Sequence, residues 1–252
     1  MPYEGRLVIR TREKVSGKET MSTETETTAL EDLNKAFKKI GKQYGYDMVA
    51  AEFGVFKEFK VQWSRSYRQA LFKVSDYMED APYEAFESLA ATLFARIDGR
   101  EEVPYKRAMR DWVLSPDFAE KKRYQYIHRS RNLTGSKIGF ERNLQDSIDR
   151  LAEMGLFDKS KGIEASWTIN SDSPKAASYS VLFKLIAVSS QLDDLHVPDY
   201  VVDYAVYSQY LKIVKGAELF GFTTEVYTRD DEKKFEKYHE AERALDRMSL
   251  YL

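Results

Sequence analysis

Few side chains in this sequence are of the types that carry catalytic or metal chemistry, and their spacing does not match the common constellations. The chain has no cysteine, which excludes disulfides, thiolate catalysis and cysteine-ligated zinc. Its three imidazoles, His128, His196 and His239, lie far apart and have no ligand spacing. No Ser-His-Asp set is recognisable, and Gly135 and Gly139 do not fit a phosphate-binding loop. A histidine-rich metal centre is therefore hard to build.

A basic stretch interleaved with aromatic residues, 121–131, has the composition of a nucleic-acid contact. Lysine and arginine bind phosphates, and tyrosine can stack on bases. Arg65, Tyr67 and Arg68 would join it if they lie nearby. The alternative is that the arginines bind carboxylates and carbonyls within the fold, and the slightly acidic charge of the chain favours this alternative. The candidate contacts are Lys121, Lys122, Arg123, Tyr124, Arg129 and Arg131.

The composition is that of an ordinary globular protein of 252 residues, with 43% apolar and 32% charged residues. Lys and Arg number 39 against 41 Asp and Glu, so the net charge of -2 gives no general attraction to nucleic acid or anionic membranes. No signal-peptide core or bilayer-length apolar run of about 20 residues is present, so we expect a cytoplasmic protein without a membrane partner. Residues 1–28 are expected to be flexible, and Met21 is a possible true start.

Hydrophobic periodicity predicts a mixed α+β chain, with strands on both sides of a helical middle section and no recognisable internal repeat. Two strand-like runs, at 59–63 and 71–75, are expected to form a hairpin across 65–68. Further strands are expected at 164–169 and 179–189. Helices are expected at 29–46, from Pro82 to Ile97, from Pro104, from Pro116 to about Ile127, at 144–154, at 200–214 and at 230–248.

The lead-in to the helix expected at 200–214 is the most distinctive segment of the chain. Residues 197–207 read VPDYVVDYAVY, and an apolar strand and turn at 180–194 precede them. Both segments resemble those around the zinc-binding helix of zincin-type metallopeptidases, in particular an uncharacterised SprT-like or minigluzincin-like group found in archaea. Shorter pieces at 63–67, 73–77, 80–82 and 129–133 are similar to the same group. The resemblance covers roughly residues 30–250.

This resemblance implies a zincin-like α+β fold in one domain, 29–252. It has a small mixed sheet, a helical middle section and a C-terminal helix pair. In the family the next five residues read His-Glu-x-x-His, so that two imidazoles four residues apart reach one zinc and the Glu activates its water. Here the same positions are Ser208, Gln209, Tyr210, Leu211 and Lys212. The third ligand of the family aligns with Tyr227.

These departures predict that the zinc site is lost. A hydroxyl is a poor zinc donor, an amide is no general base, and an ammonium with a reference pKa of about 10.4 has no free lone pair. We therefore expect no metal cofactor and no catalytic residue, and a pseudoenzyme that binds a protein partner or serves as a scaffold. Lys212 could replace the charge of the ion and pair with Glu218 or Glu225, or it could be a surface lysine. Two alternatives remain open: a metal-dependent peptidase with non-standard ligands, and a nucleic-acid-associated module using 121–131.

Overall fold

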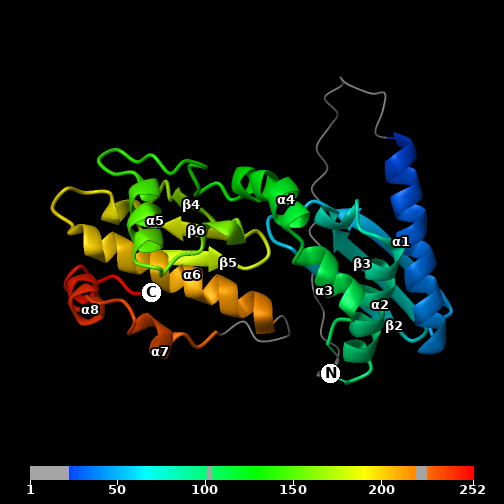
Figure 1. The fold of residues 1–252 in the computed structure, drawn as a ribbon. Helices are drawn as coiled ribbons and strands as arrows, with labels where there is room; N and C mark the ends of the chain where they lie inside the picture. The colour runs from blue at the N-terminus through cyan, green and yellow to red at the C-terminus, as the bar shows by residue number, and fades with distance from the viewer. Residues whose placement is uncertain (1–22, 101–103, 220–225) are drawn as a thin grey trace.

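The structure of the protein is a computed structural model that describes residues 23–100, 104–219 and 226–252. They form eight α-helices and six strands (Figure 1), which confirms the mixed α+β class. The helices are α1 Thr23–Gln43, α2 Tyr83–Ile97, α3 Arg107–Val113, α4 Pro116–Arg129, α5 Leu144–Glu153, α6 Asp199–Leu219, α7 Arg229–Glu232 and α8 Tyr238–Arg247, with short 3-10 helices η1 Asp76–Met78, η2 Lys159–Lys161 and η3 Ser190–Leu192. The strands are β1 Met48–Gly54, β2 Val61–Ser66, β3 Gln69–Ser75, β4 Glu164–Trp167, β5 Ala177–Ser180 and β6 Leu185–Val188.

The strands form two three-stranded sheets of identical topology, rather than one small mixed sheet. Their orders are β1-β3-β2 and β4-β6-β5. In each sheet the first strand runs parallel to the third, and the second runs antiparallel to it. A helix precedes and follows each set of strands. We call residues 23–97, from α1 to α2, the first unit, and residues 144–219, from α5 to α6, the second unit. They lie side by side, with α4 between them (Figure 1).

The ends of the third strands show the repeat in detail. Ser75 ends β3 and Ser189 follows β6, with nearly the same backbone angles, φ -57° and ψ 133° against φ -61° and ψ 133°. Each leads into a 3-10 helix, and Pro82 and Pro198 directly precede α2 and α6. The chain therefore contains an internal structural repeat. This repeat was not predicted, because it lies in strand order and backbone conformation, which local patterns in the sequence do not reveal.

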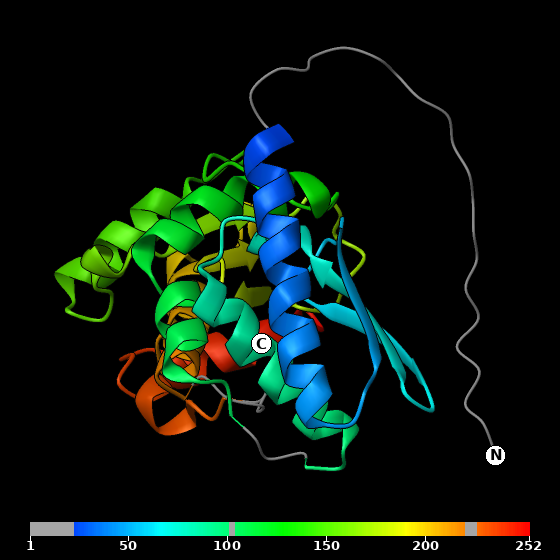
Figure 2. The ribbon, with the colours of Figure 1, turned by 90° about the vertical axis from the view of Figure 1, so that its right-hand side faces the viewer.

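Alternating burial places the first sheet against its helices on one face. Along β3, Ala70, Phe72 and Val74 are buried while Gln69 and Lys73 are exposed, as period-two geometry requires. Figure 2 shows α1 running along the first unit. The central strand of the second sheet, β6, is buried at every position, because both faces of that sheet are covered.

Two clusters of buried apolar side chains form the core, one centred on each unit and extended by side chains of α3, α4 and α8. Phe183 and Leu185 belong to the second unit by sequence but pack in the cluster of the first. The ring of Phe183 lies 4.3 Å from that of Tyr126 in α4 and 4.9 Å from that of Tyr77 in η1. The turn between β5 and β6 thus joins the two clusters.

Several expected boundaries are wrong. The run at 179–189 is a hairpin, β5 and β6, whose turn places Lys184 in the left-handed region at φ 45°. The helix expected at 230–248 is two helices, separated so that the buried Phe235 reaches the ring of Tyr204 at 5.8 Å. β1 was not predicted. α6 continues beyond Gly216, where a Cβ atom would lie 2.7 Å from a methyl of Val181.

The beginning of the chain also differs from expectation. α1 starts at Thr23, inside the segment 1–28 that was expected to be flexible. Residues 1–22, including Met21, lie outside the described residues. No helix within 23–100, 104–219 or 226–252 is long and apolar enough to cross a membrane.

Candidate functional site

The stretch that aligns with the zincin motif lies within α6, as predicted. Ser208 and Gln209 are both buried, with 0% and 1% of their surface exposed. The Gln209 Nε2 donates a hydrogen bond of 2.8 Å to the Ser208 Oγ. The side chains of Ser208 and Gln209 are therefore bonded to each other inside the protein.

Lys212, one helical turn after Ser208, faces a cavity of about 520 Å³ between α6 and the C-terminal segment. Tyr227, the residue aligned with the third ligand, lines the same cavity. Ser208 and Gln209 do not line it. Of the four candidate positions, Lys212 and Tyr227 therefore line one cavity, and Ser208 and Gln209 are buried outside its lining. Further walls come from Val226, Arg229, Glu242, Leu245, Asp246, Leu250, Tyr251 and Leu252.

A buried carboxylate, that of Glu232, also lines this cavity. The Thr228 hydroxyl donates to its Oε1 at 2.6 Å, and the Tyr204 hydroxyl donates to its Oε2 at 3.1 Å. Burial and the charge of Glu232 raise the pKa of Tyr204, so its phenol stays a neutral donor. Tyr204, Ser208 and Lys212 are four residues apart and follow one face of α6.

Two cations, Lys212 and Arg229, line the cavity together with this carboxylate. Burial lowers the pKa of Lys212, while the negative charge of Glu232 opposes that effect. No hydrogen bond or salt bridge joins Lys212 to another residue in the described part of the chain. Of the two partners expected for it, Glu218 is exposed and acts on the pKa of Lys215 instead, and Glu225 lies outside the described residues.

The donor set of this cavity does not fit a zinc ion. Among the residues that the structure describes, its lining has no imidazole and no thiolate, and the cations of Lys212 and Arg229 lie among its carboxylates, those of Glu232, Glu242 and Asp246. Zinc takes imidazole, thiolate and carboxylate ligands. The described residues hold no group of three or more His, Cys, Asp or Glu placed around a common point. The histidines do not converge here: His196 pairs with Asp194 at 2.8 Å, and the rings of His128 and His239 contact neighbouring tyrosines.

The first unit repeats the pattern of a buried hydroxyl followed by a cation. Thr92 and Arg96 stand as far from Pro82 as Ser208 and Lys212 stand from Pro198. Thr92 is buried, and Arg96 lies over the ring of Tyr105 at 5.6 Å. Neither unit therefore has imidazoles at these two helical positions.

No family model, curated protein or solved structure matches this chain. The chemistry of its own side chains is therefore the basis for assigning a function. The α6 cavity is lined by side chains of both charges and by hydrogen-bonded hydroxyls.

Residues 121–129 of the basic stretch lie in α4, and Lys122, Arg123 and Arg129 are engaged within the protein. Arg123 donates to the backbone oxygens of Phe183 at 2.8 Å and Gly162 at 2.7 Å. Lys122 pairs with Asp80 at 2.8 Å. These contacts tie α4 to both units, because Asp80 belongs to the first unit and the two carbonyls belong to the second.

Arg129 completes this attachment. Its guanidinium donates to both oxygens of the buried Asp76, at 2.7 and 2.5 Å, and to the Phe56 oxygen at 2.8 Å. It also lies over the ring of Tyr77 at 5.0 Å. Lys121, Tyr124 and Arg131 remain exposed, while Arg65 donates to the Ile97 oxygen and Arg68 pairs with Asp47. The contacts support the internal role of Lys122, Arg123 and Arg129, and nucleic-acid binding stays a prediction.

Glu232 was not predicted to belong to the site. It lies in a run of charged residues, 230–234, at the start of the helix expected at 230–248, where acidic side chains favour the positive end of the helix dipole. The spacing of Thr228 and Glu232, four residues apart, is a weak signal of the hydrogen bond between them. The approach of this segment to α6 depends on tertiary structure that local patterns do not encode.

Proposed function

We propose that this chain is a metallopeptidase-like protein without a catalytic zinc site, which acts by binding a protein partner. The observation that carries the proposal is the placement of a cation and a buried carboxylate in the lining of one cavity, at α6. Lys212, at the position of the second zinc ligand in the resembled family, faces the buried carboxylate of Glu232. An ammonium there supplies positive charge without a coordination site.

The chemistry of the neighbouring groups supports a non-hydrolytic role. Peptide hydrolysis by this class of enzyme needs a Lewis acid and a base that takes a proton from water. Gln209 is an amide and its Nε2 is already bound to Ser208. Both oxygens of Glu232 accept hydrogen bonds from hydroxyls, so this carboxylate is held as an acceptor.

Exposed aromatic side chains support a protein partner. Trp63, Tyr67, Tyr124 and Phe140 are all exposed, and aromatic residues are enriched at protein interfaces. The arginines of α4, by contrast, are engaged within the fold.

A zinc titration by calorimetry tests this proposal. The wild-type protein is expected to bind no stoichiometric zinc, whereas Ser208→His/Gln209→Glu/Lys212→His should bind one equivalent, with native Glu232 as a further ligand. Adding Glu232→Gln to this triple variant should weaken zinc binding by roughly tenfold or more. A second version, with Tyr227→His added, compares the two placements of the third ligand, and circular dichroism verifies folding of each variant.

Two results would contradict the proposal. One is tight, stoichiometric zinc binding by the wild type that Lys212→Ala abolishes. The other is a triple variant that folds yet takes up no metal with either third ligand, which would mean that α6 does not correspond to a zinc-binding helix.

A further inference from the structure

A second cavity, of about 490 Å³, lies beside the N-terminal ends of α5 and α6. Exposed apolar side chains form part of its lining. Ile138, Phe140 and Leu195 line it, with 72%, 92% and 69% of their surface exposed. Single exposed apolar residues are common on proteins, but three around one cavity mark an interaction site. This cavity shares no lining residue with the one that contains Lys212.

The loop that carries Phe140 is held rigidly. The Asp193 carboxylate accepts hydrogen bonds from the backbone N–H groups of Phe140, Glu141 and Arg142, at 2.5, 3.0 and 2.8 Å. A Cβ at Gly139 would lie 2.4 Å from an oxygen of Asp193, so only glycine allows this approach. Because the loop is fixed before binding, presenting Phe140 to a partner costs little conformational entropy.

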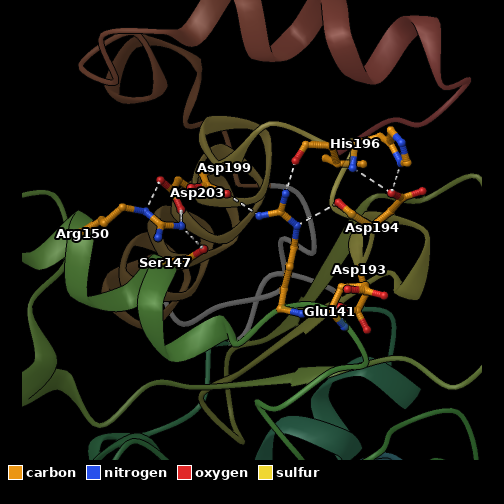
Figure 3. A network of polar contacts seen from close by, with 10 residues as sticks. Glu141, Ser147, Arg150, Asp193, Asp194, His196, Asp199 and Asp203 are labelled. Atoms are coloured by element: carbon orange, nitrogen blue, oxygen red, sulfur yellow. Dashed lines mark hydrogen bonds and ion pairs between the residues drawn. The ribbon is translucent and has the colours of Figure 1, made fainter.

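The arginines next to this loop are committed to contacts inside the protein, as Figure 3 shows. Arg142 donates to the backbone oxygen of Asp194 at 3.0 Å and binds the Val197 oxygen and the Asp199 carboxylate. Arg150 donates to both oxygens of Asp203, at 2.9 and 2.7 Å. The positive charge beside the cavity is therefore largely neutralised.

Acidic side chains on the rim keep their charge available. Glu141 and Asp146 line the cavity and are exposed, and neither forms a salt bridge with another residue among those the structure describes. The surface thus combines an apolar centre with an acidic rim. We refer to Ile138, Phe140, Glu141, Asp146 and Leu195 together as the Phe140 surface.

We infer that the Phe140 surface docks a basic, amphipathic segment of a protein partner, with apolar side chains of that segment packing around Phe140 and its lysines or arginines facing Glu141 and Asp146. Aromatic residues, phenylalanine included, are enriched at protein interfaces. The acidic rim selects the sign of the partner's charge. The inference rests on the proposed function, since it names the kind of partner and the surface that binds it.

Two labelled synthetic peptides of equal length, one of leucine and lysine and one of leucine and glutamate, test the inference by fluorescence anisotropy with the full chain. The lysine peptide is expected to bind at least about tenfold more tightly than the glutamate peptide. Phe140→Ala should weaken the lysine peptide by about tenfold or more. Ile169→Ala, which removes an exposed apolar side chain of the same unit, should leave its affinity unchanged. Glu141→Gln/Asp146→Asn should reduce both affinity and salt dependence.

Each other outcome overturns the inference: no binding of either peptide, equal binding of both, or equal losses for Phe140→Ala and Ile169→Ala. Failure here is distinguishable from failure of the proposed function. The zinc titration reports on the α6 cavity, and Phe140→Ala leaves that cavity unchanged, so a zinc-free wild type with no peptide binding would reject the Phe140 surface alone.

Discussion

Phe183→Ala is expected to lower the free energy of unfolding by about 3–5 kcal/mol. Phe183 is 2% exposed, and its ring packs between Tyr126, Tyr77 and Phe118, at centroid distances of 4.3, 4.9 and 6.2 Å. Alanine would remove these contacts and leave a cavity where the second unit meets the core of the first. The hydrogen bond from the Arg123 side chain to the backbone oxygen of Phe183 would keep the turn in place, so the cavity would collapse incompletely.

Chemical unfolding in urea measures this loss, and Phe140→Ala is the matched control. The control makes the same chemical change at a side chain that is 92% exposed, and it should alter stability by no more than about 0.5 kcal/mol. If Phe183→Ala destabilised the protein no more than this control, the two units would not be joined through the Phe183 ring.

Asp76→Ala is expected to cost about 3–5 kcal/mol, because it leaves the guanidinium of Arg129 partly buried without its carboxylate. The side chains of Asp76 and Arg129 are 9% and 18% exposed, and two hydrogen bonds join them. Gln125 also donates to Asp76, at 3.3 Å. The Phe56 carbonyl and the Tyr77 ring would remain, but neither carries the negative charge that Arg129 loses.

Thermal and urea unfolding of three variants separate this pair from an ordinary surface contact. Asp111→Ala breaks an exposed pair with Arg107 and should change stability by less than about 1 kcal/mol. Adding Arg129→Met to Asp76→Ala should recover part of the loss, since it removes the unpaired charge. Equal, small effects of Asp76→Ala and Asp111→Ala would show that α4 is not anchored through this ion pair.

Helix starts were the part of the fold that local chemistry encoded best. Ser115 and Asn143 begin α4 and α5, where their side chains accept backbone N–H bonds from Phe118 at 3.2 Å and Gln145 at 3.0 Å. Pro82 correctly marks the start of α2. Such signals lie within a few residues of each other, so a single sequence contains them in full.

The sheets were harder, because strand pairing joins distant residues. β1 pairs with β3, although β2 lies between them in the sequence. The residues of β1, Met48–Gly54, do not indicate which strand is their partner. On the edge strand β1, the Asn34 side chain donates to the Ala51 backbone oxygen at 2.7 Å and accepts from the Ala51 backbone N–H at 3.0 Å. A helical asparagine gives no local sign that it covers a sheet edge.

The candidate site shows the same division. That Lys212 follows Ser208 on one helical face could be expected from spacing alone. The carboxylate it faces could not, because Glu232 reaches α6 through a turn and a short helix that follow residues 220–225. Sequence spacing therefore identified Lys212 as a candidate, whereas only the tertiary structure identified Glu232.

The measurement that tests the central claim most directly is an NMR pH titration of the Lys212 side chain, assigned with Lys212→Arg. The structure predicts a pKa below the ordinary lysine value, because burial disfavours the ammonium, and a further decrease in Glu232→Gln, because that change removes the charge that favours it. Lys215 serves as an internal reference, since its hydrogen bond with Asp231 raises its pKa. A Lys212 pKa at the ordinary value, unchanged by Glu232→Gln, would contradict the assignment of this ammonium as the counter-charge of Glu232 in the α6 cavity.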